Sequence, residues 1–248
     1  MQIYRILLTA HDDIFFATYE MGSLIETGVY LHNYALSYAL FENYLVRPNR
    51  QVGRNAQRPG YVDPLDERSL LCLNELGIYV FPAKPIKIVR CSEEDSVINP
   101  RLPVEEGYYR PVRKQFGDSA VQGRRNRPYG PLRCKGLWIG SEHCAFVVSR
   151  SAINFPAWIR LGKWAAKVKV DIQEHFDNPP TQIGSFELNH PINPIDSSIP
   201  IGVYHKKIVM PPSSLVSVAR LTGEHWNLYG VSLPTQMCYG CGFQRQAR

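Results

Sequence analysis

A short stretch, residues 159–170, combines four cations with an aromatic ring and contains no acidic residue. The cations are Arg160, Lys163, Lys167 and Lys169, and Trp164 lies between them. Cationic side chains neutralise phosphates, and an aromatic ring offers a nucleobase a surface for stacking. The stretch therefore predicts contact with a phosphodiester backbone. The alternative is the solvated outer face of an ordinary sheet, with Trp164 in the core.

The same stretch is predicted to be a β-strand from Trp164 onward, because apolar and polar residues alternate there. One face would carry Val168, Val170 and Ile172, and the other Lys167, Lys169 and Asp171. Gly162 precedes the strand and predicts a bend or a tight approach of the backbone.

A second basic segment lies in residues 91–136, where proline and glycine recur. Between residues 101 and 135, nine cations accompany three acids, and this excess of six equals the net charge of the chain, +6. Tyrosine and phenylalanine are interleaved with the cations, a mixture that favours single-stranded nucleic acid over a base-reading helix. A solvated charge run is the alternative. The expected RNA contacts are Arg110, Arg113, Lys114, Arg124, Arg125, Arg127 and Arg133.

The sequence offers little support for metal or covalent chemistry. Cys238 and Cys241 form a Cys-x-x-Cys pair, but structural zinc needs four ligands and no second pair has a matching spacing. We therefore expect reduced thiols, no metal and no cofactor. The chain has no glycine-rich phosphate loop and no Gly-x-Ser-x-Gly motif. None of the seven histidines is singled out as a base, so we expect no catalytic residue, although a metal-independent endoribonuclease stays open.

The elements that must position these residues are short, because nineteen prolines and eighteen glycines interrupt the chain. The order predicts an α+β protein with a mostly antiparallel sheet and few helices. Helices are expected within 30–45 and 66–76. Strands are expected at 2–9, at 78–81 paired with 86–90, at 137–139 paired with 145–148, and at 201–210 and 217–221. A proline-rich connector is expected from 178 to 200.

The composition limits the possible domain size, the class of partner and the location of the protein. With 248 residues, of which 44% are apolar, the chain can form one large domain or a domain with a big insertion. A pI near 9.0 favours polyanionic partners. We see no signal peptide and no apolar run that could span a membrane, so we expect a cytoplasmic protein with no membrane partner.

Several separated motifs resemble one family of CRISPR proteins. These are the run from His11 to Ala17, residues 20–28, the helix-like run from Leu31 to Leu40, and Arg160-Leu-Gly-Lys-Trp164. They are similar to the fifth Cas family in its subtype I-D form, a subunit of the type I-D Cascade complex. Near the end of the chain, residues 239–243 resemble the glycine-rich loop that RAMP proteins carry close to their C-termini.

The resemblance implies a ferredoxin-like or RRM-like RAMP core formed by residues 1–90 and 137–248. Residues 91–136 would then be a long basic, thumb-like insertion. It also implies binding to the 5′ handle of CRISPR RNA (crRNA) at one end of a filament of the repeated backbone subunit. The large subunit would dock beside it, near the PAM end of the target DNA. A separate subunit is expected to process the precursor RNA. The glycine-rich loop adds Gly240, Gly242 and Arg245 to the expected RNA contacts.

Overall fold

The computed structural model describes residues 1–248 except 22–23, 46–60, 67–68, 90–132, 202 and 243–248. Its largest element is a six-stranded antiparallel sheet in the order β4-β7-β1-β9-β8, with β5 also paired to β7. The strands are β1 (Gln2–Ala10), β4 (Tyr79–Val80), β5 (Lys84–Lys87), β7 (Glu142–Ser149), β8 (Trp158–Leu161) and β9 (Ala166–Asp177). Strands from both sides of the predicted insertion thus meet in one sheet.

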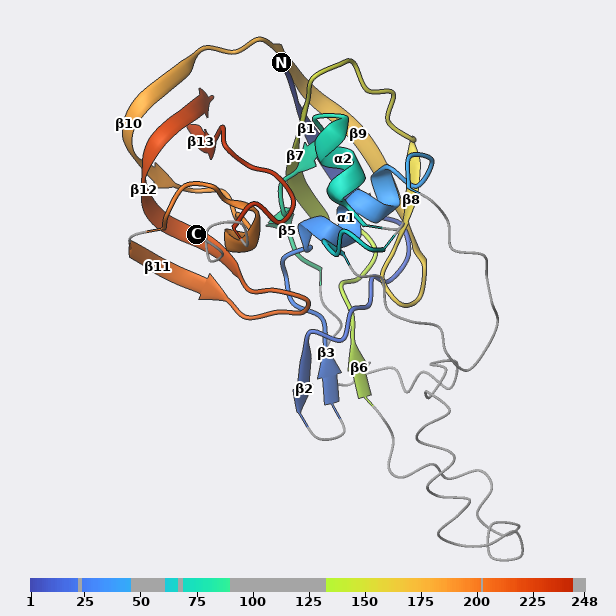
Figure 1. Cartoon of the computed structure of the whole chain (residues 1–248). Helices are drawn as coiled ribbons and strands as arrows, with labels where there is room; N and C mark the ends of the chain where they lie inside the picture. The colour runs from blue at the N-terminus through green and yellow to red at the C-terminus, as the bar shows by residue number, and fades with distance from the viewer. Residues whose placement is uncertain (22–23, 46–60, 67–68, 90–132, 202, 243–248) are drawn as a thin grey trace, which may run out of the picture.

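Two helices, α1 (Asn33–Leu40) and α2 (Leu71–Glu75), lie on one face of this sheet (Figure 1). The helix α1 buries Tyr34, Leu36 and Leu40 in the hydrophobic core. The side chain of His32 caps its first turn by accepting a hydrogen bond from the backbone N–H of Tyr34 at 3.1 Å.

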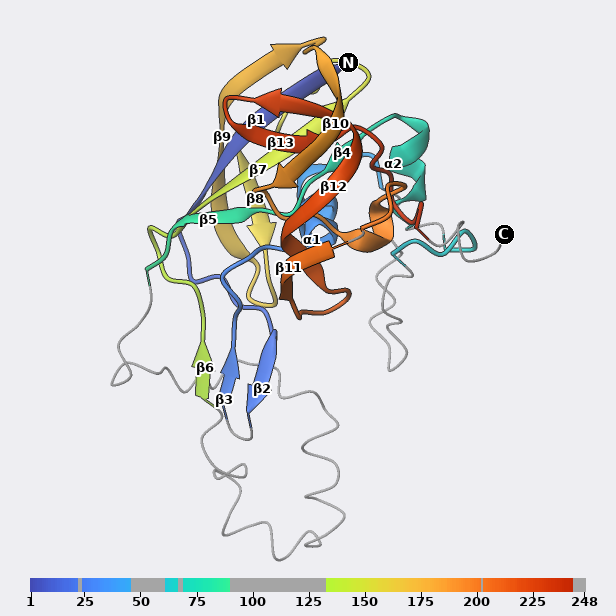
Figure 2. The ribbon, with the colours of Figure 1, turned by 90° about the vertical axis from the view of Figure 1, so that its left-hand side faces the viewer.

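A second, curled sheet packs beside the first (Figures 1 and 2). It has the order β10-β12-β11, with β13 also paired to β12. Its strands are β10 (Thr181–Leu188), β11 (Val203–Ile208), β12 (Leu215–Leu228) and β13 (Val231–Pro234). Phe186, Leu188 and Trp226 from this sheet belong to the same hydrophobic core as β1 and β7. The two sheets therefore stabilise each other.

A third, small sheet extends away from the core (Figures 1 and 2). It consists of β2 (Tyr19–Met21), β3 (Leu24–Glu26) and β6 (Arg133–Lys135), with β6 parallel to β3. Residues 133–135 belong to the predicted insertion, and here they pair with a strand from the N-terminal part of the chain.

The sequence predicted several strands correctly but paired some of them wrongly. The strands at 78–81 and 86–90 do not pair with each other; β4 and β5 both pair with β7. Likewise, β7 pairs with β1, and Leu137 forms only an isolated bridge with Ile14. The predicted connector at 178–200 contains β10 and the short 3-10 helix η2 (Pro194–Asp196), because its prolines flank 181–188 and leave that segment free to pair.

Among the described residues, no helix is long and apolar enough to cross a membrane.

Candidate nucleic-acid interface

The predicted cationic strand is confirmed as part of the β8–β9 hairpin at the open edge of the six-stranded sheet. Trp158 pairs with Lys169, and Arg160 pairs with Lys167. Residues directly opposite each other in an antiparallel pair share a face of the sheet, as do residues two apart on one strand. Trp158, Arg160, Lys167 and Lys169 therefore lie on one face, which we call the β8–β9 surface.

The apolar face of β9 is confirmed for two of its three predicted residues. Val168 and Val170 are buried at 0% and 7% exposure, whereas Ile172 is 49% exposed. The reason is the short partner strand: β8 pairs only with residues 166–169 of β9. Ile172 consequently lies where β9 has no neighbour on that edge.

The β8–β9 surface continues across the sheet as one row of paired residues. Successive partners along this row are Lys87, Glu142, Thr9, Lys169 and Trp158. The opposite end of the same face is covered by residues that follow strands of the second sheet. The ring of Phe146 contacts that of His190, which follows β10, and the ring of Phe176 contacts that of Tyr229, which follows β12. The row thus lies away from the covered end of this face.

Trp158 supplies the exposed aromatic ring of this surface. Its side chain is 42% exposed, and the Lys167 ammonium lies 4.0 Å from the ring centroid in a cation–π contact. The ring of His11 meets it edge-on, with the centroids 4.9 Å apart. Sequence reasoning missed Trp158, although the alternation of residues 158–161 carried the signal, since Ile159 and Leu161 are buried while Trp158 and Arg160 are exposed.

The cations of the surface are only loosely engaged within the protein. Arg160 lies 3.6 Å from the carboxylate of Asp12 and donates a hydrogen bond to the carbonyl of Ala165 at 3.1 Å. Lys169 pairs with Asp171 at 2.9 Å. Ion pairs at this exposure contribute only ~0–1 kcal/mol. A phosphate can therefore compete for both cations at little cost.

The turn between β8 and β9 explains the positions of Lys163 and Trp164. Gly162 has φ +75°, and a Cβ there would lie 2.5 Å from the carbonyl oxygen of Phe15, so the predicted tight approach is confirmed. The backbone N–H of Lys163 donates to the same oxygen at 2.8 Å. The Trp164 ring stacks on Phe15 with centroids 4.5 Å apart. Trp164 is thus partly buried against the core, which agrees with the alternative interpretation of this residue as a core aromatic.

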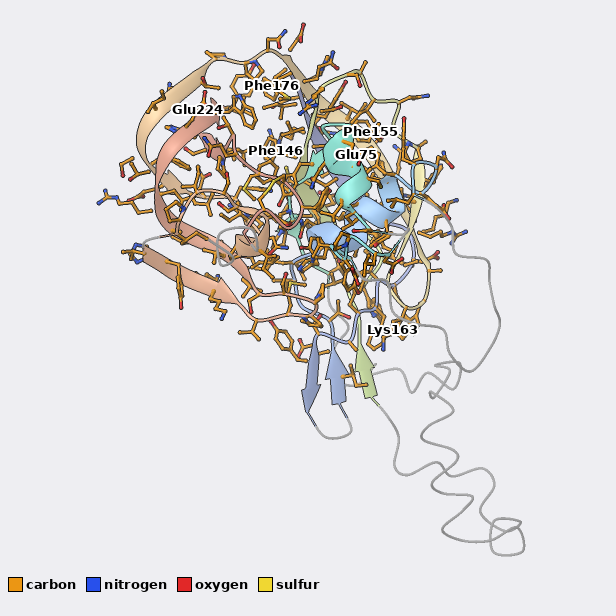
Figure 3. The ribbon with its side chains drawn as sticks, in the orientation of Figure 1. Glu75, Phe146, Phe155, Lys163, Phe176 and Glu224 are labelled. Atoms are coloured by element: carbon orange, nitrogen blue, oxygen red, sulfur yellow. A yellow bond between two sulfur atoms is a disulfide. The ribbon has the colours of Figure 1, made fainter. Side chains whose placement is uncertain are left out.

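The Lys163 side chain is exposed at the end of the core from which β6 extends (Figure 3). This end is also where the chain enters and leaves the predicted basic insertion. Lys163 and the root of the insertion therefore lie on the same side of the molecule.

The profile described as type I-D CRISPR-associated protein Cas5/Csc1 matches residues 1–242. The chain belongs to the type I-D Cas5/Csc1 family. A search of curated proteins found no match. Among solved structures, one chain of the type III-B Cmr-beta complex bound to cognate target RNA and AMPPnP has a TM-score of 0.39 and 9% identity. That alignment covers 89% of this chain and 84% of the Cmr chain.

The structure places the predicted RNA contacts of this Cas5/Csc1 protein in different settings. The insertion residues Arg110, Arg113, Lys114, Arg124, Arg125 and Arg127 lie outside the described residues, as does Arg245. Arg133 lies on β6, where its backbone pairs with Leu24. Among the predicted contacts within the described residues, Arg160, Lys163, Lys167 and Lys169 come together at the β8–β9 hairpin.

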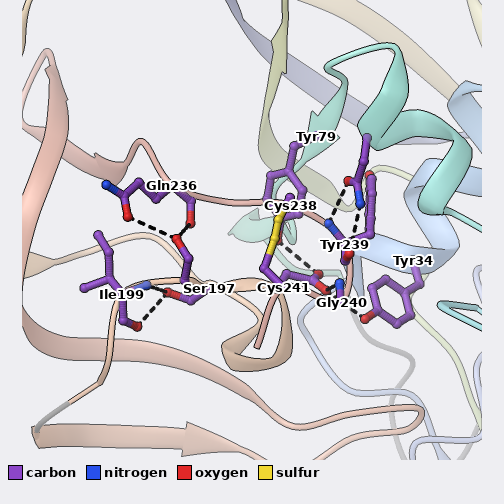
Figure 4. The surroundings of a disulfide bond; sticks show 12 residues. Tyr34, Tyr79, Ser197, Ile199, Gln236, Cys238, Tyr239, Gly240 and Cys241 are labelled. Carbon is purple, nitrogen blue, oxygen red and sulfur yellow. Dashed lines mark hydrogen bonds between the residues drawn. A yellow bond between two sulfur atoms is a disulfide. The ribbon is translucent and has the colours of Figure 1, made fainter. Parts of the chain in front are cut away.

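The two C-terminal glycines are explained by contacts within the chain. The N–H of Gly240 donates to the Asp196 carboxylate at 2.9 Å (Figure 4). A Cβ on Gly242 would lie 2.6 Å from the carbonyl oxygen of Ile195, to which the Gly242 N–H donates at 2.7 Å. The close approach predicted for this loop is therefore to residues 195–196, and the approach to RNA stays a prediction.

The prediction of reduced thiols at Cys238 and Cys241 is wrong for this structure, in which the two residues form a disulfide (Figure 4). Their Cα atoms are 5.6 Å apart, within the range that disulfides span. The loop brings them together because Cys238 N–H donates to the Asp196 carbonyl and Cys241 N–H to the Cys238 carbonyl. Among the described residues, no group of three His, Cys, Asp or Glu side chains is arranged to hold a metal ion.

Three of the histidines are structural groups in the interior. Burial lowers the pKa of His32 and of His143 to about 4, and that of His190 to about 3. They are therefore neutral at physiological pH. His32 contacts Ser213, and His143 contacts the carbonyl of Val29 at 3.1 Å. His11, in contrast, is exposed within the β8–β9 surface.

Proposed function

We propose that this protein binds single-stranded RNA through the β8–β9 surface, as a non-catalytic subunit of a type I-D CRISPR effector complex. Its ligand in the complex is the 5′ handle of crRNA. In this role it caps the filament of the repeated backbone subunit and helps to dock the large subunit near the PAM end of target DNA. The antiparallel sheet, with helices on one face, supports an RRM-like RAMP core. Residues 91–136 are, in this proposal, its thumb-like insertion.

One observation carries the proposal: the strand register presents Trp158, Arg160, Lys167 and Lys169 on a single accessible face. An aromatic ring among cations is what a flexible single strand requires, since its bases are unstacked and its phosphates are evenly spaced. Membership in the type I-D Cas5/Csc1 family supports crRNA as the natural ligand.

Binding should weaken steeply with salt, because each neutralised phosphate releases condensed counterions. For single strands, the slope of log K against log salt is about −0.7 per contact. Two to four contacts from this surface give an expected slope of about −1.4 to −2.8. The measurement is a titration of the full chain with a handle-containing RNA from ~50 to ~200 mM salt. A slope near zero would count against the proposal.

The absence of catalysis is a separate prediction with its own test. His11 favours the alternative, because this exposed imidazole contacts the same Trp158 ring as the Lys167 ammonium, and a metal-independent ribonuclease needs a base and a cation. We expect repeat RNA to stay intact when it is incubated with the purified protein in EDTA. A discrete product that disappears with His11→Ala would replace this proposal with an endoribonuclease.

A further inference from the structure

A pocket of about 340 Å³ lies between α1 and β8, directly beside the β8–β9 surface. On the helix side its lining includes Ala35, Tyr38 and Ala39, which share one face because they are three and four residues apart. On the strand side it includes Trp158 and Arg160. The two alanines leave the space open, since any longer side chain at either position would project into it.

We infer that this pocket holds one unstacked nucleobase of the single-stranded RNA bound at the β8–β9 surface, an inference that rests on the proposed function. Its volume falls near the lower end of the ~300–1,000 Å³ typical of small-ligand sites, which suits a single planar ring system. A whole nucleotide chain cannot enter it. The phosphates must consequently stay outside, along the cations.

The lining residues match the chemistry of a base. Tyr38 from the helix and Trp158 from the strand both line the pocket, so two aromatic residues are available to a base. Trp158 holds the Lys167 ammonium on its ring yet stays 42% exposed, which leaves ring surface for stacking. Asn43, also in the lining, offers an amide donor and an acceptor for the edge of a base.

The cations fix where the backbone of the RNA would run. Arg160 and Lys167 line the pocket, and Lys163 follows Gly162 of the lining at the adjacent turn. A strand whose phosphates contact these residues passes the pocket and can turn one base into it. The arrangement therefore separates two contributions: charge for the backbone and a half-open pocket with aromatic residues in its lining for one base.

The test uses the full chain and a single-stranded RNA of about eight nucleotides, within the ~4–16 that single-strand binding folds cover. A companion series replaces each nucleoside in turn with an abasic one, which keeps every phosphate and removes one base. We expect the wild type to lose about tenfold in affinity at one position and little elsewhere, as loss of one stacked base predicts. Equal affinity for all members of the series would overturn the inference.

The variant Ala39→Phe fills the pocket, and Ala152→Phe is its matched control, because it makes the same substitution at an exposed residue outside the pocket lining. We expect Ala39→Phe to bind intact RNA about tenfold more weakly, and to bind the critical abasic RNA as well as the wild type does. Ala152→Phe should behave like the wild type. If Ala39→Phe binds intact RNA normally, or loses affinity equally for intact and abasic RNA, the inference is wrong.

Failure of the inference and failure of the proposed function are distinguishable. A protein that binds the whole abasic series with the same steep salt dependence still has its phosphate contacts, so only the base pocket is lost. A protein that shows no salt-dependent binding to any RNA lacks the proposed function itself. The abasic series needs no variant, so it decides the question even if Ala39→Phe fails to fold.

Discussion

Reversing the charge of Arg160 and Lys163 together should weaken binding of the handle RNA about 100-fold. Each side chain is exposed, and each would lose a hydrogen bond to a charged phosphate oxygen, worth ~1.5–3 kcal/mol. Two such losses, taken at the lower end of this range, correspond to about two orders of magnitude in Kd. In Arg160→Glu, Asp12 loses its cationic partner and a second carboxylate is added beside it. Both changes increase the repulsion between this surface and the phosphates of the RNA. The measurement is fluorescence anisotropy at fixed salt, with the salt slope determined in parallel.

The matched control for this double variant lies on the second sheet. Lys206 and Lys207 are both exposed on β11, away from the β8–β9 hairpin (Figure 1). Lys206→Glu/Lys207→Glu changes the net charge by the same amount, so it measures the effect of overall charge alone. We expect it to retain RNA binding within about threefold. Equal losses in both double variants would mean that the β8–β9 surface has no special role.

A neutral double variant, Arg160→Gln/Lys163→Gln, removes both charges without reversing them. Its affinity for RNA should lie between those of the wild type and the charge-reversed variant. The magnitude of its salt slope should fall by about 1.4, the contribution of two phosphate contacts. All three variants should unfold at the wild-type temperature, since exposed side chains of this kind contribute little to stability. Loss of binding together with a lower unfolding temperature would point to misfolding.

The sequence was informative where the periodicity was strong and local. The alternation from residue 164 onward predicted β9, and the apolar spacing at 31–45 predicted a helix in the segment that contains α1. Both signals arise because one face of the element is buried, and each can be read from a few consecutive residues. The cationic face of the candidate site was visible for the same reason.

Strand partners were not visible, because pairing depends on contacts between distant segments. The strand β7 lies between β1, β4 and β5, and its sequence does not encode which neighbour it meets on each edge. A similar limit applied to the aromatic residues of the site. Trp158 is exposed and Trp164 is partly buried because the turn at Gly162 directs Trp164 toward Phe15, nearly 150 residues earlier in the chain.

The second large effect concerns stability and centres on Asp196, a buried carboxylate that anchors the C-terminal loop. It accepts hydrogen bonds from Gly240 N–H at 2.9 Å, Asn33 Nδ2 at 2.8 Å, Tyr34 OH at 2.9 Å and Tyr79 OH at 3.2 Å. All four groups donate, so the site is built for an acceptor. In Asp196→Asn, the new NH₂ group must face at least one of these donors.

We therefore expect Asp196→Asn to lower the free energy of unfolding by about 3 kcal/mol at pH 7.5, because buried donors would be left without an acceptor. Chemical denaturation followed by tryptophan fluorescence measures this change. Asp177→Asn is the matched control, since it makes the same change at an exposed position on β9. The control should alter stability by less than about 0.5 kcal/mol. Similar losses in both variants would mean that the hydrogen bonds to Asp196 contribute little.

The pH dependence of the difference between wild type and Asp196→Asn has a defined sign. Burial raises the pKa of Asp196 from 3.8 to about 6, against the opposing effect of the donated hydrogen bonds. Between about pH 4 and pH 6 the folded protein consequently holds a proton that the unfolded chain has released, so this group favours folding more as the pH falls. The asparagine variant cannot titrate there. The stability gap should thus widen by about 1 kcal/mol from pH 7.5 to pH 5. A gap that narrows over this range would mean that the four donors outweigh burial and hold the pKa below its ordinary value.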